Sequence, residues 1–75
     1  MKQVFLELGG DEALVLFELL ARRTDAGGRL EVRHEGEDRA LDALAAALES
    51  KLAEPFAADY RDLVGQALAR LAART

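Results

Sequence analysis

The side chains best suited to chemistry gather around the single histidine of this 75-residue chain. His34 is followed closely by Glu35, Glu37 and Asp38. One imidazole and several carboxylates can ligate a divalent cation. Their spacing differs from that of an EF-hand loop, where oxygen ligands recur at alternate positions and a glutamate closes the loop at position twelve. Because Gly36 interrupts the group, we interpret it as a solvated turn and predict no metal site, with a metal- or small-molecule-binding protein as the weaker alternative.

Other residues that could act in catalysis are few and scattered. The aliphatic hydroxyls, none of which has the histidine as a near neighbour in sequence, are Thr24, Ser50 and Thr75. Carboxylates on outward helix faces, which we interpret as solvating charges, include Glu18, Glu49 and Asp62. The chain has no cysteine and no phosphate-binding loop of the pattern G-x-x-x-x-G-K-[ST]. We therefore predict a protein that is not an enzyme and has no cofactor.

The charge pattern restricts the kind of partner. The formal net charge is −4, which disfavours a nucleic acid as a direct ligand and suits a basic protein partner. Arginines are interleaved with acids; Arg29 and Arg33 share one face of a short segment, which is weak support for an anion site.

Composition and hydropathy indicate one globular domain, residues 1–75, located in the cytoplasm. Hydrophobic residues make up 51% of the chain, more than a disordered protein contains. No segment approaches the ~20 apolar residues of a membrane span, and the apolar run near Met1 is too short for a signal peptide. Absence of cysteine fits a reducing compartment.

The segment 11–23 predicts a helix around which the other elements must pack. Apolar side chains cover most of its circumference, and Val15 and Leu19 fall on a flank that a solvated helix would make polar. Such a helix must be covered from two directions, so we expect the rest of the chain to supply one cover and a second copy of the chain to be available as the other. We expect Asp11 to cap its start.

Two segments alternate apolar and polar residues with the period of a β-strand, namely 3–8 and 29–34. We expect these short strands to lie side by side against the first helix.

Two further helices are predicted at about 38–53 and 59–74. Their apolar residues recur at spacings of three and four, and Asp38 and Asp59 are expected caps. Pro55 separates them, so we expect an antiparallel helical hairpin with Phe56 filling its corner. Gly65 and Ala69 form a small-residue flank suited to close helix contact, within the chain or across a dimer; a tolerated exposed glycine is the alternative. The predicted fold is α+β and mainly helical, with an all-α three-helix bundle as the alternative.

Several segments resemble a family of small bacterial proteins of unknown function. They are Glu12–Glu18 (EALVLFE), Arg39–Leu41 and Glu54–Phe56 followed by Asp59-Tyr60. The last of these is the most specific, and the resemblance extends from the first helix to the third. Asp42, Ala43 and Ala45 depart from the family pattern. The resemblance implies a small cytoplasmic bacterial protein and supplies no catalytic residue.

These observations predict a small acidic protein-interaction module that self-associates as a homodimer. The candidate interface consists of Val15, Leu19, Gly65 and Ala69. The alternative is an inhibitor of the antitoxin or immunity type, which would mask a basic protein partner by charge complementarity.

Overall fold

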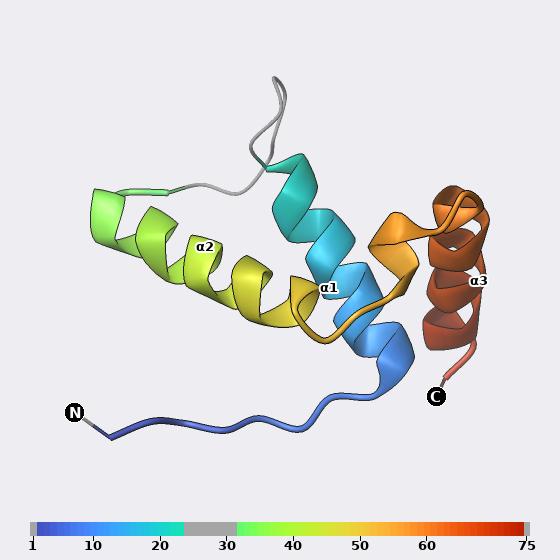
Figure 1. Cartoon of the computed structure of the whole chain (residues 1–75), viewed down its shortest axis with the longest axis horizontal. Helices are drawn as coiled ribbons and strands as arrows, with labels where there is room; N and C mark the ends of the chain where they lie inside the picture. The colour runs from blue at the N-terminus through green and yellow to red at the C-terminus, as the bar shows by residue number, and fades with distance from the viewer. Residues whose placement is uncertain (1, 24–31, 75) are drawn as a thin grey trace.

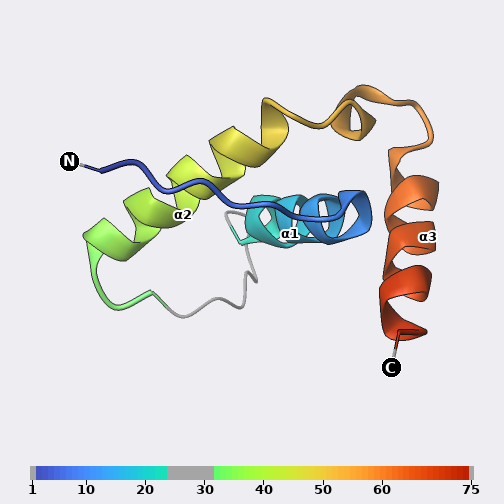
Figure 2. The ribbon, with the colours of Figure 1, turned by 90° about the horizontal axis from the view of Figure 1, so that it is seen from below.

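Three α-helices carry the architecture of the protein, whose structure, a computed structural model, describes residues 2–23 and 32–74 (Figure 1). Helix α1 spans Gly10–Arg22, α2 spans Glu35–Glu49 and α3 spans Tyr60–Ala72, with a single 3-10 turn, η1, at Glu54–Phe56. α1 lies between α2 and α3, and each of them packs against it (Figure 2). Within the described ranges, no helix has both the length and the apolar character needed to cross a membrane.

The predicted α+β class is wrong, and the described residues agree with the all-helical alternative. Residues 2–9 are extended, but residues 2–23 and 32–74 contain no strand. Of the second predicted strand, 29–31 lie outside the described residues, and Val32 and Arg33 are not in a strand. An alternating segment becomes a strand only when another segment hydrogen-bonds to it, and the described part of the chain offers none.

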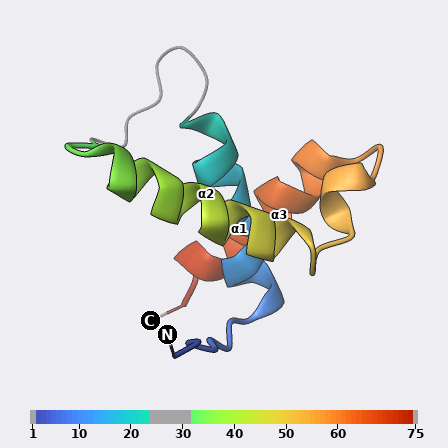
Figure 3. The same ribbon diagram turned by 60° about the vertical axis from the view of Figure 1, so that its left-hand side comes forward.

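The predicted hairpin of α2 and α3 is also wrong, because both helices make their main contacts with α1. Figure 3 shows them splayed across α1. α2 ends at Glu49, earlier than the predicted end near residue 53, and Pro55 lies in the separate turn η1. Phe56, expected to fill the corner, is 81% exposed. Both helices pack on the apolar surface of α1, so the link between α2 and α3 does not form a packed corner.

The core lies on two sides of α1. On the α3 side, Leu14 packs with Val64 and Ala67, which are 3%, 8% and 0% exposed. On the α2 side, Leu20 is 3% exposed and Leu48 of α2 is also buried. The chain itself thus covers α1 from two directions.

The three described helices begin with different capping arrangements. Gly9, not Asp11, is the N-cap of α1, and its N–H donates to the Glu12 carboxylate at 2.8 Å. α2 begins three residues before the expected cap Asp38, because the Nδ1 atom of His34 accepts from the Gly36 N–H at 2.9 Å. Asp59 is the N-cap of α3 as predicted, without a side-chain hydrogen bond.

Arg23 links the end of α1 to α2. Its side chain is only 5% exposed and forms ion pairs with Asp38 and Asp42. The guanidinium also donates to the Leu20 carbonyl at 3.2 Å and to the Asp38 carbonyl at 3.1 Å. Its Nε is buried without a hydrogen-bond partner among the described residues. A buried guanidinium is stable only with such partners, so Arg23 fixes how α2 sits on α1.

The other end of α1 is tied to α3 by ion pairs. Arg70 donates two hydrogen bonds, both 2.8 Å long, to the carboxylate of Asp11. These bonds and the charge of Arg70 hold the pKa of Asp11 below its ordinary value. Arg74 lies 3.4 Å from Glu12. The C-terminal turn of α3 therefore lies at the start of α1, so the two helices run in opposite senses.

Arg23→Ala should lower the free energy of unfolding by about 2–4 kcal/mol, because it leaves polar groups of both helices without their partner. The measurement is urea denaturation followed by circular dichroism. Arg22→Ala is the matched control: Arg22 is 65% exposed in an i,i+4 pair with Glu18, so its loss should cost about 0.5 kcal/mol or less. Equal losses in the two variants would contradict the role assigned to Arg23.

Ala67→Leu should destabilise the protein by about 1–3 kcal/mol, because Ala67 is fully buried where α3 meets α1 and has no room for a larger side chain. Thermal denaturation measures the effect. Ala43→Leu makes the same change at an exposed position of α2 and should leave stability within about 0.5 kcal/mol of the wild type. A tolerated Ala67→Leu would contradict this packing.

Candidate protein-interaction surface

Among the described residues, the largest exposed apolar feature is the N-terminal arm, which we define as residues 2–9. Val4, Phe5 and Leu6 are 82%, 87% and 75% exposed. The arm leaves the start of α1 and runs along the lower side of the molecule, away from α3 (Figure 1). No backbone hydrogen bond joins residues 2–8 to any described part of the chain. Apolar side chains gathered on unpaired extended backbone are characteristic of an interaction site.

The arm is extended for local reasons. Valine, phenylalanine and leucine alternate with polar residues, which favours extended backbone. The backbone of Gly9 is also extended, with φ −65° and ψ 157°, so the extended chain continues to the first residue of α1. Leu8, nearest the helices, is 40% exposed, about half as much as Phe5. Leu8 is therefore the least exposed of the large apolar side chains of the arm, and it lies at the end next to α1.

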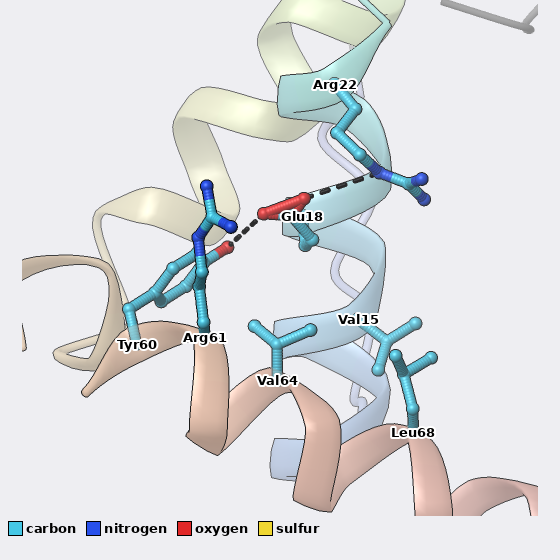
Figure 4. Close-up of a pocket in the computed structure, with 7 residues that line it drawn as sticks. All are labelled: Val15, Glu18, Arg22, Tyr60, Arg61, Val64 and Leu68. Atoms are coloured by element: carbon cyan, nitrogen blue, oxygen red, sulfur yellow. Dashed lines mark hydrogen bonds and ion pairs between the residues drawn. The ribbon is translucent and has the colours of Figure 1, made fainter.

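A second feature is an open groove of about 650 Å³ between α1 and α3 (Figure 4). Val15, Val64 and Leu68 form its apolar wall. Leu68 is 50% exposed, whereas Val64 belongs to the core. The polar end of the groove is formed by Glu18, Arg22, Tyr60 and Arg61.

Glu18 joins the two helices at the polar end of this groove. The Tyr60 hydroxyl donates to Oε1 of Glu18 at 3.1 Å, and Nε of Arg22 lies 3.4 Å from Oε2. The Glu18 side chain is 25% exposed, so the expectation of a purely solvating charge is wrong. Burial raises the pKa of Tyr60 to about 12, with further contributions from the charge of Glu18 and its hydrogen bond.

This arrangement favours structure over acid–base chemistry. A phenol with a pKa of about 12 stays protonated at neutral pH and serves as a donor. Glu18 accepts that donor and pairs with Arg22, so its charge is already engaged. Glu18 and Tyr60 therefore serve to join α1 to α3.

The four predicted interface residues do not share one environment. Val15 packs against the core cluster on the α3 side, whereas Leu19 is 38% exposed. Gly65 and Ala69 are exposed on α3, and a Cβ atom at Gly65 would meet nothing within 4 Å. The close helix contact predicted at Gly65 is therefore not made within the described chain; a contact across a dimer stays a prediction.

The residues around His34 form hydrogen bonds and an ion pair at the N-terminal end of α2. Besides the His34 cap, the Glu37 carboxylate accepts the Arg33 N–H at 2.6 Å, and Glu35 lies 3.9 Å from Arg39. Among the described residues, no three potential metal ligands of the types His, Cys, Asp and Glu lie close enough to hold an ion together.

Sequence reasoning missed Arg23 and the arm as sites of interest. Arg23 follows Leu20 by three residues and Leu16 by seven, so it falls on the apolar stripe of the helix. An arginine on the apolar stripe of a helix is the sequence feature that could have predicted a buried ion pair. The arm carried the pattern of a strand, but the sequence did not indicate that its partner would be absent.

Comparisons with known proteins gave no match to any family model, curated protein or solved structure. The resemblance to small bacterial proteins therefore stays a prediction.

Tyr60 is the only tyrosine and the chain lacks tryptophan, so absorbance at 295 nm during an alkaline titration reports this phenol alone. We expect a pKa of about 12 in the folded protein, against 10.0 ordinarily. Because the folded-state pKa is raised, the stabilisation from the neutral phenol is complete below pH 10 and is lost as the pH rises toward 12.

Glu18→Gln should lower the pKa of Tyr60, because it removes the carboxylate charge, but leave it above 10, because burial is the largest cause. Glu49→Gln, on the exposed end of α2, is the control and should not change the titration. A wild-type value near 10, or equal values in both variants, would contradict the Glu18–Tyr60 contact.

Proposed function

We propose that this chain is a non-enzymatic protein-interaction module that self-associates as a homodimer in the bacterial cytoplasm. The observation that carries the proposal is the N-terminal arm, whose Val4, Phe5 and Leu6 are at least 75% exposed. Transferring such side chains from water into an interface contributes roughly 1.5–3 kcal/mol each before ordering costs.

The buried core on both sides of α1 is complete without the arm, although Leu68 and Phe56 are also exposed. α1 is already covered on one side by α2 and on the other by α3. The exposed apolar residues of the arm are therefore available to a second molecule, and the nearest chemically matched surface is the same arm in another copy. Symmetric pairing of one patch with itself is the commonest form of oligomer interface.

An inhibitor of a basic protein remains the second candidate, supported by the acidic residues along α2. Much of this charge is used within the chain. Asp38 and Asp42 pair with Arg23, and Glu35 is close to Arg39. Less acidic surface is therefore free for a basic partner, and self-association has the stronger support.

The test is the mass of the wild-type protein by sedimentation equilibrium across a range of micromolar concentrations, where we expect a dimer. The double variant Val4→Glu with Leu6→Glu should be monomeric, because two buried charges without partners oppose association. Its helical circular dichroism should match that of the wild type, because neither residue belongs to the core.

Leu19→Glu is the control, because Leu19 is an exposed leucine of α1 distant in sequence from the arm. This variant should remain dimeric. A monomeric wild type would refute self-association, and a monomeric Leu19→Glu variant with a dimeric arm variant would move the interface to α1.

A further inference from the structure

We infer that two copies of the chain pair through their N-terminal arms as an antiparallel two-stranded ribbon, with the Phe5 of one copy opposite the Phe5 of the other. This inference rests on the proposed self-association and specifies the segment, direction and register of the contact. It starts from residues 2–8, which are extended, exposed and without backbone partners in the described chain.

The alternation of side chains along the arm restricts the registers in which two arms can pair. Val4, Leu6 and Leu8 lie on one side of the extended chain, and Gln3, Phe5 and Glu7 lie on the other. When the two-fold axis is perpendicular to the plane of the ribbon, side chains from the same side of the two strands project from the same face of the ribbon. Each residue is then paired with a residue whose side chain is on that same face. Both copies then place their valine and leucines on a common face.

Centring the axis on Phe5 pairs all seven residues from 2 to 8. Val4 then faces Leu6, and Gln3 faces Glu7, where the amide can donate to the carboxylate. Phe5 faces its own copy, which allows the two rings to pack together. Centring on Leu6 instead would set Phe5 against Glu7 and would leave Lys2 beyond the paired residues.

Charge favours the antiparallel direction. Parallel arms in register would place Lys2 beside Lys2 and Glu7 beside Glu7, and like charges on adjacent strands repel. In the antiparallel register Lys2 faces Leu8 of the second copy, close to the acidic first turn of its α1 with Asp11 and Glu12. Extended Gly9 lets the strand reach that turn without a break.

The experiment is disulfide cross-linking of the full chain, which has no native cysteine. In an antiparallel pair, opposed Cα atoms are about 4.5 or 5.5 Å apart, and both distances lie within disulfide range. Phe5→Cys in a glutathione redox buffer should therefore form a covalent dimer. Gln3→Cys and Leu6→Cys should do so at least about tenfold less, because about two to four residues of offset along the strand carries identical positions out of range.

A second pair of variants keeps Phe5 intact. Gln3→Cys mixed with Glu7→Cys should form the mixed disulfide in preference to either self-linked species, because these positions face each other. Ser50→Cys, exposed at the end of α2, reports random collision.

The outcomes separate the two proposals. A wild-type dimer in which Phe5→Cys links no better than Ser50→Cys, and in which the mixed pair does not form, overturns arm pairing while self-association stands. Strong linking of Leu6→Cys in place of Phe5→Cys overturns the register. A monomeric wild type overturns the proposed function and the arm pairing with it.

Discussion

The packing of α1 between two other helices is the constraint on which the rest of the structure depends. Its apolar residues face more than one direction, so a single neighbour cannot remove them from water. Leu14 is buried against α3, and Leu20 is buried on the side of α2. α2 and α3 make their main contacts with α1 and not with each other.

Apolar packing has little directional preference, so polar contacts decide how the helices are oriented. Arg23 fixes α2 at the C-terminal end of α1, while Asp11 and Arg70 join the opposite end to α3. The Tyr60–Glu18 hydrogen bond adds a contact near the start of α3. Each of these links bridges residues on two helices, which is why they specify one arrangement among many with similar apolar burial.

The arm and the helical core follow different physical rules. Helices satisfy their own backbone donors, apart from the ends, so α1 to α3 form wherever side-chain packing supports them. An extended segment cannot satisfy its backbone internally, so its donors and acceptors bind water or another chain segment. The arm makes no backbone hydrogen bond with the described helices from residues 2–8, and this is why we propose it as the surface for association.

The sequence by itself determined the three helices, the apolar faces of α1 and α2 and the cap at Asp59, because these depend on local periodicity and backbone restrictions. Its alternating pattern at 3–8 indicated extended backbone, but the paired strand predicted there does not form. Only the tertiary structure decided that α2 and α3 contact α1 instead of forming a hairpin, that Val15 is partly covered while Leu19 is exposed, and that Phe56 faces solvent. It alone also showed Arg23 to be buried between α1 and α2. These features depend on which distant segments meet, and spacing along the chain does not encode that choice.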